Sequence, residues 1–276
     1  MTATTLAPTV GPDVRVTFPR ILASETIKFR TVRSTFWALP ITAVIMAAFA
    51  ALQGWGATQM EMTAADLGAG VASLAVSGVI FAQVVLAVLA ILSIGGEYST
   101  GQIRSTLTAV PTRVPALLGK AVVVFVGVFV AGLVSVALSL AASLPFLSRL
   151  GLSLEWSGDT VRVLVGAALY LATIALFAFA IGALMRHTAG AIAVVLGLLL
   201  VVENVVAALP FRFFEVIAPY LPQSAGSRIL MDDTALAAVT EFSGTSLGPW
   251  QGYAVLAAWT LVLLAAATVL LRRRDA

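Results

Sequence analysis

Few side chains in this chain of 276 residues could carry out chemistry. There is no cysteine, which excludes disulfides and thiolate metal sites, and the single histidine, His187, makes a poor basis for haem or zinc ligation. The GxxxxGK[ST] phosphate-binding pattern fails at its only Gly-Lys pair, because Ala121 follows Gly119 and Lys120. We read His187 as a turn or headgroup residue, with proton handling as the alternative. The sequence therefore predicts a chain that is not an enzyme and holds no cofactor or metal of its own.

A second group of polar side chains stands inside long apolar runs, where burial of polar atoms is costly and usually serves a function. These candidate pathway or gate residues are Glu203, Asn204, Gln83 and Tyr170. For Glu203 two roles are open: a structural one, by pairing with Arg212 or Arg162 or by lining an outer vestibule, and direct contact with cargo or a gate. Gln83 and Tyr170 are more typical of hydrogen bonds between helices.

The elements that must position these residues are six charge-poor runs, each about the length that crosses the hydrocarbon core as a helix. They are residues 37–53, 71–95, 121–144, 161–185, 188–209 and 250–271. Of the charged residues only Arg162 and Glu203 fall inside them. The chain is 60% hydrophobic and 11% charged, whereas a soluble domain carries roughly 25% charge. Because the runs are continuously apolar and do not alternate, they exclude a β-barrel and predict an all-α polytopic membrane protein.

The basic residues predict its orientation. Twelve of the 16 lysines and arginines fall on the side of the two termini, which places both termini inside by the positive-inside rule. The excess of positive charge then reflects topology, so no nucleic-acid partner is expected.

Residues 18–36 have the pattern of an amphipathic helix at the inner membrane surface. Its apolar stripe is Phe18, Ile21, Leu22, Phe29, Val32 and Phe36. A helix lying in the headgroups would explain the stripe, but Glu25 projects from its middle. A carboxylate there is costly without a partner, so we expect it to meet a basic residue of the 96–120 segment or a second protein.

The 96–120 segment is the most informative loop. Ser99 or Thr100 can cap a helix that Pro111 ends. Ile103, Leu107 and Val110 would share one face of that helix, with Arg104 and Thr108 beside it. Periodicity alone leaves two readings open: a rigid peg that docks into another protein, or an ordinary amphipathic surface turn.

Several strings in order resemble the type-2 family of ABC transporter permeases. They are SETIKFRTVRST, EYSTGQIRSTL followed by PTR, APYLPQSAG, and GPWQGY with the ending LLRRRDA. The resemblance implies a permease half that dimerises with a second copy or a homologue and works with a separate ATPase subunit, which binds the ATP. It makes residues 96–113 a coupling helix and residues 18–36 a connecting helix. The coupling residues would be Glu97, Tyr98, Gly101, Ile103, Arg104, Leu107 and Arg113, and those of the connecting helix Glu25, Arg30 and Arg33.

The resemblance further implies one membrane domain over residues 1–276, with a polar tail at 1–17, in the bacterial plasma membrane. The implied function is ATP-driven export of a small molecule, lipid or peptide. The alternative is a membrane scaffold or sensor of an ABC-type complex, which signals or confers immunity without moving cargo.

Small residues at intervals of four mark helix-packing seams in membranes. Such a row predicts a buried seam on the third span. Its members are Gly127, Ala131, Ser135, Ser139 and Ser143. Alanine-rich rows on the first span (Ala43, Ala47, Ala51) and the fifth (Ala189, Ala193, Gly197) fit the implied dimer contact or translocation path.

The outer segment, residues 210–249, is apolar but broken by Pro210, Pro219 and Pro222. We expect short re-entrant helices before the last span, acting as a lid on the exit. Arg228, Asp232 and Asp233 are expected to face water.

Overall fold

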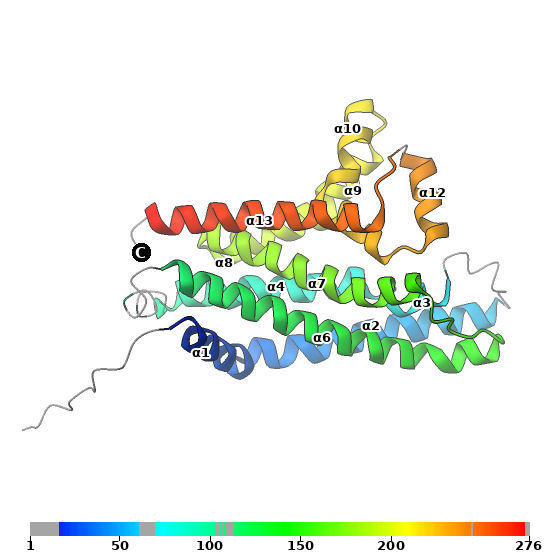
Figure 1. Cartoon of the computed structure of the whole chain (residues 1–276), viewed down its shortest axis with the longest axis horizontal. Coiled ribbons are helices and arrows are strands. Elements are labelled where there is room, and N and C mark those ends of the chain that lie inside the picture. The colour runs from blue at the N-terminus through cyan, green and yellow to red at the C-terminus, as the bar shows by residue number, and fades with distance from the viewer. Residues whose placement is uncertain are drawn as a thin grey trace, which may run out of the picture.

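The computed structural model describes residues 17–60, 70–102, 105, 108, 113–243 and 245–273. In these ranges every regular element is helical, and the long helices form an elongated bundle (Figure 1). Helix α1 (Phe18–Thr31) and the C-terminal end of α13 (Pro249–Arg273) lie at one end of this bundle, which we call the α1 end (Figure 1). The all-α class predicted from the uninterrupted apolar runs is confirmed.

Within the described residues, six helices are long and apolar enough to cross a membrane, as the sequence predicts. Their bounds are Arg33–Gln59, Ala72–Ser99, Val114–Arg149, Gly158–Met185, Thr188–Ala208 and Pro249–Arg273. In hydrocarbon, backbone N–H and C=O groups must be paired inside the segment, which is why each apolar run becomes a helix. The chain is therefore a multi-pass membrane protein.

The amphipathic helix ends earlier than predicted. Helix α1 stops at Thr31, Val32 is extended, and α2 (Arg33–Gln59) begins directly after it. Residues 33–36, assigned to the connecting helix from the sequence, thus belong to the first span. The break lets the two helices take different directions, so that α1 can pack against α6 (Val114–Arg149) while α2 enters the bundle.

Helix α1 lies along the first turns of α6. A Cβ atom on Gly119 would come within 2.8 Å of Ile21, and one on Gly127 within 2.5 Å of the Phe29 ring. The two contacts are equally spaced on both helices, so α1 and α6 run in the same direction there. With 36 residues, α6 is about 54 Å long, well beyond the ~30 Å of hydrocarbon. Ile21 and Phe29 of the apolar stripe thus face α6, whereas Phe18, Val32 and Phe36 are exposed.

The second apolar run is divided into α3 (Gly70–Val76) and α4 (Val79–Ser99). At the joint, a Cβ atom on Gly78 would lie 2.6 Å from the Cα atom of Met46 on α2. Glycine is therefore required at this crossing, where two backbones approach closely.

The seam predicted on the third span is confirmed for its serines. Ser135, Ser139 and Ser143 are buried, and the Ser139 hydroxyl lies 3.0 Å from the Met46 carbonyl oxygen and 2.6 Å from that of Ala75. These contacts hold α6 against α2 and α3. The rows on the other two spans differ from this one.

On α2 the buried row is Thr42, Met46, Ala50 and Gly54, one position before the predicted alanines, which are half-buried. On the fifth span Ala189 and Ala193 are exposed. Neither predicted row is thus a seam within one chain.

The fourth span, α7 (Gly158–Met185), is the most buried and forms the centre of the bundle. The fifth begins with α8 (Thr188–Leu196), whose N-terminus is capped by His187: its Nδ1 accepts the Gly190 N–H at 3.0 Å. This contact agrees with the interpretation of His187 as a turn residue. The span continues as a π-helical turn, η1 (Gly197–Val202), and ends as α9 (Glu203–Ala208).

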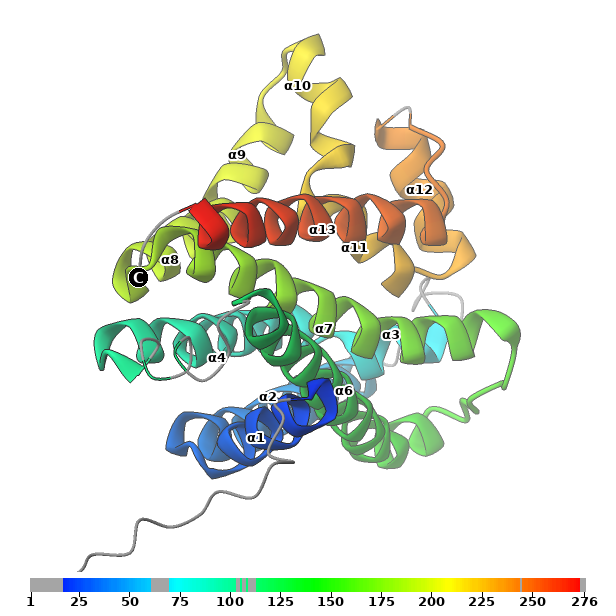
Figure 2. The same ribbon diagram turned by 60° about the vertical axis from the view of Figure 1, so that its left-hand side comes forward.

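Short helices follow, as expected from the prolines. They are α10 (Arg212–Ile217), η2 (Ala218–Tyr220), α11 (Pro222–Gly226), η3 (Ser227–Leu230) and α12 (Asp233–Ser243). Helices α10 and α12 stand away from the bundle on the side of α13 (Figures 1 and 2). In contrast, α11 returns to it: a Cβ atom on Gly226 would lie 2.5 Å from Leu256 on α13 and 3.0 Å from Tyr170 on α7.

The prediction that Arg228 faces water is wrong. Its side chain is 2% exposed, and Nη1 donates to the Leu247 carbonyl oxygen at 2.8 Å. The return of η3 to the bundle brings this guanidinium beneath the connection to α13, where it satisfies backbone carbonyls. Asp233 is exposed as expected, and Asp232, partly buried, caps α12 by accepting the Ala235 N–H.

Candidate functional site

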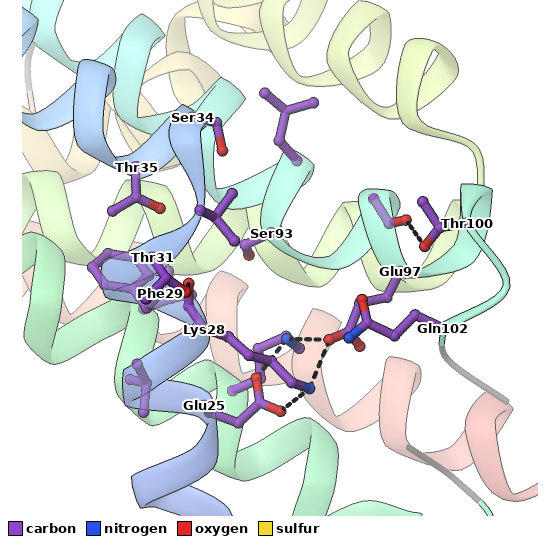
Figure 3. A pocket seen from close by; sticks show the side chains of 16 residues that line it. Glu25, Lys28, Phe29, Thr31, Ser34, Thr35, Ser93, Glu97, Thr100 and Gln102 are labelled. Atoms are coloured by element: carbon purple, nitrogen blue, oxygen red, sulfur yellow. Dashed lines mark hydrogen bonds and ion pairs between the residues drawn. The ribbon is translucent and has the colours of Figure 1, made fainter. Parts of the chain in front are cut away.

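A cluster of charged side chains lies at the α1 end, between α1, α4 and α6 (Figure 3). We call it the lysine–glutamate cluster; its members are Glu25, Lys28, Glu97 and Lys120. Lys120 Nζ lies 2.5 Å from Glu25 Oε2 and 2.9 Å from Glu97 Oε1. Lys28 Nζ lies 2.7 Å from Glu25 Oε1 and 3.0 Å from Glu97 Oε1. Each ammonium thus bridges the same two carboxylates.

Three members are almost completely buried: Glu25 is 3% exposed, Glu97 5% and Lys120 7%. Ions at such sites persist only when opposite charges and hydrogen bonds offset the lost hydration. The two carboxylates and two ammonium groups balance in charge. The expectation that Glu25 meets a basic residue of the 96–120 segment is confirmed, and the partner is Lys120.

Sequence reasoning missed both lysines as site residues, although a signal was present. They are the only two lysines in the chain, whereas arginine occurs 14 times. An ammonium is a compact charge with three donors that fits between two carboxylates, whereas a planar guanidinium favours a fork-like pairing. The spacing on α1 also pointed to Lys28, which follows Glu25 by one helical turn.

The charge of Lys28 makes the stability of the cluster dependent on pH. Burial lowers the pKa of Lys28, but hydrogen bonds and charge from Glu25 and Glu97 outweigh it, so the pKa is raised above its ordinary 10.5. A raised lysine pKa stabilises the fold fully below the unfolded-state pKa, and that contribution is lost as the pH rises through the folded-state pKa.

We therefore expect the thermal midpoint of the wild type to exceed that of Lys28→Met by a constant margin up to about pH 10, and the margin to shrink above it. Thermal unfolding of both proteins from neutral pH to pH 11.5 measures this. Lys28→Arg is the control, because a guanidinium keeps its charge throughout. A margin that grows with pH would contradict the assignment.

The structure places the predicted coupling residues in different environments. Glu97 and Tyr98 lie in the last turn of α4, and Gly101, with a φ of +73°, follows its end. The Ser99 and Thr100 hydroxyls donate back to the Gly96 carbonyl oxygen. The helix that they are predicted to cap lies largely outside the described residues, so that role stays a prediction. The two residues stand at the end of α4, which runs past the predicted end of the span. Ile103, Arg104 and Leu107 lie outside the described residues.

Two arginines frame this end of the bundle. The Arg186 guanidinium lies over the Tyr98 ring, 5.5 Å from its centroid, which joins the turn after α7 to the end of α4. Arg113, with a φ of +58°, precedes α6, and its Nη1 lies 3.4 Å from the Leu271 carbonyl oxygen on α13. Of the predicted residues around the connecting helix, Arg30 and Arg33 are exposed.

A second polar network joins α4, α7, α9 and α11 in the other half of the bundle. Glu203 accepts the Gln223 and Ser224 N–H groups, both at 2.8 Å, and the Ser224 hydroxyl at 2.9 Å. Gln83 Nε2 donates to Gln223 Oε1 at 2.8 Å, and the Tyr170 hydroxyl donates to Gln83 Oε1 at 2.6 Å. Three of the predicted pathway residues thus meet in one network.

The partner expected for Glu203 is wrong. Arg162 instead bonds Asp159, Asp233 and the Met231 carbonyl oxygen, and Arg212 is exposed on α10. Glu203 caps the N-terminus of α11, where a carboxylate compensates unpaired N–H groups and the helix dipole. The sequence offered no signal for this, because the acceptor and the donors lie on separate elements.

Asn204 is apart from the network. It is exposed, and its Nδ2 donates to the Leu200 carbonyl oxygen one turn earlier.

The string GTSLG at 244–248 matches GxSxG, which marks the nucleophilic serine of many hydrolases. That motif needs a strand–turn–helix setting and a histidine partner. Residues 245–248 are irregular, and His187, the only histidine, precedes α8 on another part of the bundle. The match therefore lacks the context that the chemistry requires.

Among the described residues, no group of three or more His, Cys, Asp or Glu side chains could hold a metal ion. Comparison with known protein families found no match, and comparison with curated proteins found none.

Proposed function

We propose that the chain is the membrane-spanning permease subunit of an ATP-driven ABC exporter. The observation that carries the proposal is the lysine–glutamate cluster, which joins α1 to both sides of the 96–120 segment. Glu97 lies at the start of the proposed coupling segment, in the last turn of α4, and Lys120 lies at the end of the 96–120 segment, in α6. A motor subunit that pushes this segment would thus act on α1, α4 and α6 together.

The rest of the α1 end fits this role. The Tyr98–Arg186 contact links the same segment to the turn between α7 and α8, and Arg113 reaches the last turns of α13. A displacement at the segment can thereby reach the second, third, fourth and last spans. ATP binding would close two partner ATPase subunits, and two permease chains would shift from inward to outward access.

In this proposal the chain functions in the bacterial plasma membrane with both termini inside, as a dimer with a second copy or a homologue. Its cargo would be a small molecule, lipid or peptide. Helices α9 to α12 would form the outer lid. The Glu203 network supports that assignment, because it attaches α11 to α4 and α7.

The test is reconstitution of the full chain in vesicles with the ATPase encoded beside its gene. We expect the ATPase to co-purify, and Arg104→Ala to lower both co-purification and cargo-stimulated ATP hydrolysis. Arg149→Ala, an exposed arginine in the last turn of α6 at its other end, is the control and should leave both unchanged. If no ATPase binds, the proposal fails. If an ATPase binds but no cargo stimulates it or crosses, the scaffold or sensor alternative is favoured.

A further inference from the structure

One carboxylate oxygen of the lysine–glutamate cluster accepts no hydrogen bond from the described residues. Glu97 Oε1 receives both lysines, but Glu97 Oε2 is buried and has no hydrogen-bond partner among the described residues. A buried acceptor without a donor is costly, and native structures seldom keep one without a reason. This atom therefore points to a donor that the described part of the chain does not supply.

A cavity lies beside that carboxylate. It has a volume of about 400 Å³ and is formed by α1, α2, α4 and α6 with the residues after α4 (Figure 3). That volume is in the range of small-molecule sites. Glu97 is one of the residues that line this cavity, so the oxygen without a partner belongs to the cavity wall.

The wall is charged toward the α1 end, where the whole lysine–glutamate cluster lines it, and is mixed polar and apolar farther along the bundle axis. Glu97 and Gln102 lie toward the α1 end, whereas Leu92 and Val124 lie about one turn farther into their helices and are apolar. Thr35 and Ser93 lie on the same wall. The cavity thus offers an acceptor at the α1 end and apolar side chains farther along the bundle axis, which suits an amphiphile lying parallel to the helices.

We propose that this cavity binds the protonated amine of an amphiphile, with the ammonium donating to Glu97 Oε2 and the first part of the tail against Leu92 and Val124. An anion is disfavoured because it would face the free carboxylate oxygen, while the lysine ammonium groups are engaged by two carboxylates each. The amine can come from an aminophospholipid of the bilayer or from a free amphiphilic amine. This site does not depend on the proposed transport function.

The experiment uses the full chain in nanodiscs of dioleoylphosphatidylcholine, into which dioleoylphosphatidylethanolamine or dodecylamine is titrated, with bound molecules counted by native mass spectrometry. A choline headgroup has no N–H donor, so we expect an amine to be retained over phosphatidylcholine by about tenfold or more. Retention of phosphatidylethanolamine identifies a lipid site; retention of dodecylamine alone identifies a site for free amines.

Two variants separate recognition from folding. Glu97→Gln should reduce the preference to about one. Gly96→Leu should remove binding and leave the cluster intact, because Gly96 lines the cavity, is helical, and has open space where its Cβ would stand. Gly56→Leu is the matched control: a helical glycine with the same open space on α2, outside the cavity lining. Equal retention of amine and choline lipids, preferred binding of phosphatidylglycerol, or unchanged binding in Gly96→Leu would each overturn the proposal.

Discussion

Replacing Lys120 with methionine is expected to destabilise the protein by about 3–5 kcal/mol, the cost of leaving a buried charge without its partner. Methionine keeps most of the volume, so the effect comes from the charge. Glu25 and Glu97 would then share Lys28 alone, whose side chain is 30% exposed. The thermal midpoint of the purified protein, followed by size-exclusion chromatography after heating, measures the loss.

The double variant Glu25→Gln with Lys120→Met is the decisive control. It removes one charge of each sign and leaves Lys28 with Glu97, so it should be more stable than Lys120→Met alone. Lys28→Met, at the more exposed position, should cost less than Lys120→Met. A Lys120→Met protein as stable as the wild type would show that the cluster does not hold α1 to α6.

Replacing Glu203 with alanine is expected to cost about 3 kcal/mol, because the Gln223 and Ser224 N–H groups would lose their acceptor at a partly buried position. Glu203→Gln should have an intermediate effect, since its amide has one acceptor oxygen in place of two. Amide hydrogen exchange at Gln223 and Ser224, together with the thermal midpoint, measures the release of α11.

Asn204→Ala is the matched control, an adjacent polar residue on the same helix whose side chain is exposed. It should leave exchange at Gln223 and Ser224 unchanged. If Glu203→Ala also leaves these amides protected, the carboxylate does not cap α11, and a direct role in the pathway becomes the better account of its burial.

The helix count was readable from the sequence because it rests on a local rule. An apolar run of membrane length has one way to pair its backbone, so six runs predict six helices. The ends of the helices were predicted less well from the sequence. The extension of α4 through Ser99 and the break at Val32 depend on packing against neighbours, and local capping signals at Ser99 and Thr100 suggested a different end.

For the candidate sites too, the sequence predicted some features and the tertiary structure decided others. Glu25 was recognisable as a residue in need of a partner, because a carboxylate in an apolar stripe is costly wherever the helix lies. The choice between Lys120 and a second protein could not be made from spacing, since Glu25 and Lys120 are far apart in the chain. Glu203 shows the limit more clearly: its place inside an apolar run marked it as a residue with a role, but Arg162 and Arg212, offered as its partners, were the wrong ones.

The sequence by itself determined the class of protein, the number of spans and the residues whose burial requires compensation, because these follow from transfer energies and from hydrogen bonding within a segment. Only the tertiary structure decided which donors compensate them. Partners on different helices are chosen by how the helices cross, and close approaches such as Gly78 against Met46 set those crossings. The same crossings also leave one buried oxygen of Glu97 without a partner, on a residue that lines a cavity, which no pattern along the chain could indicate.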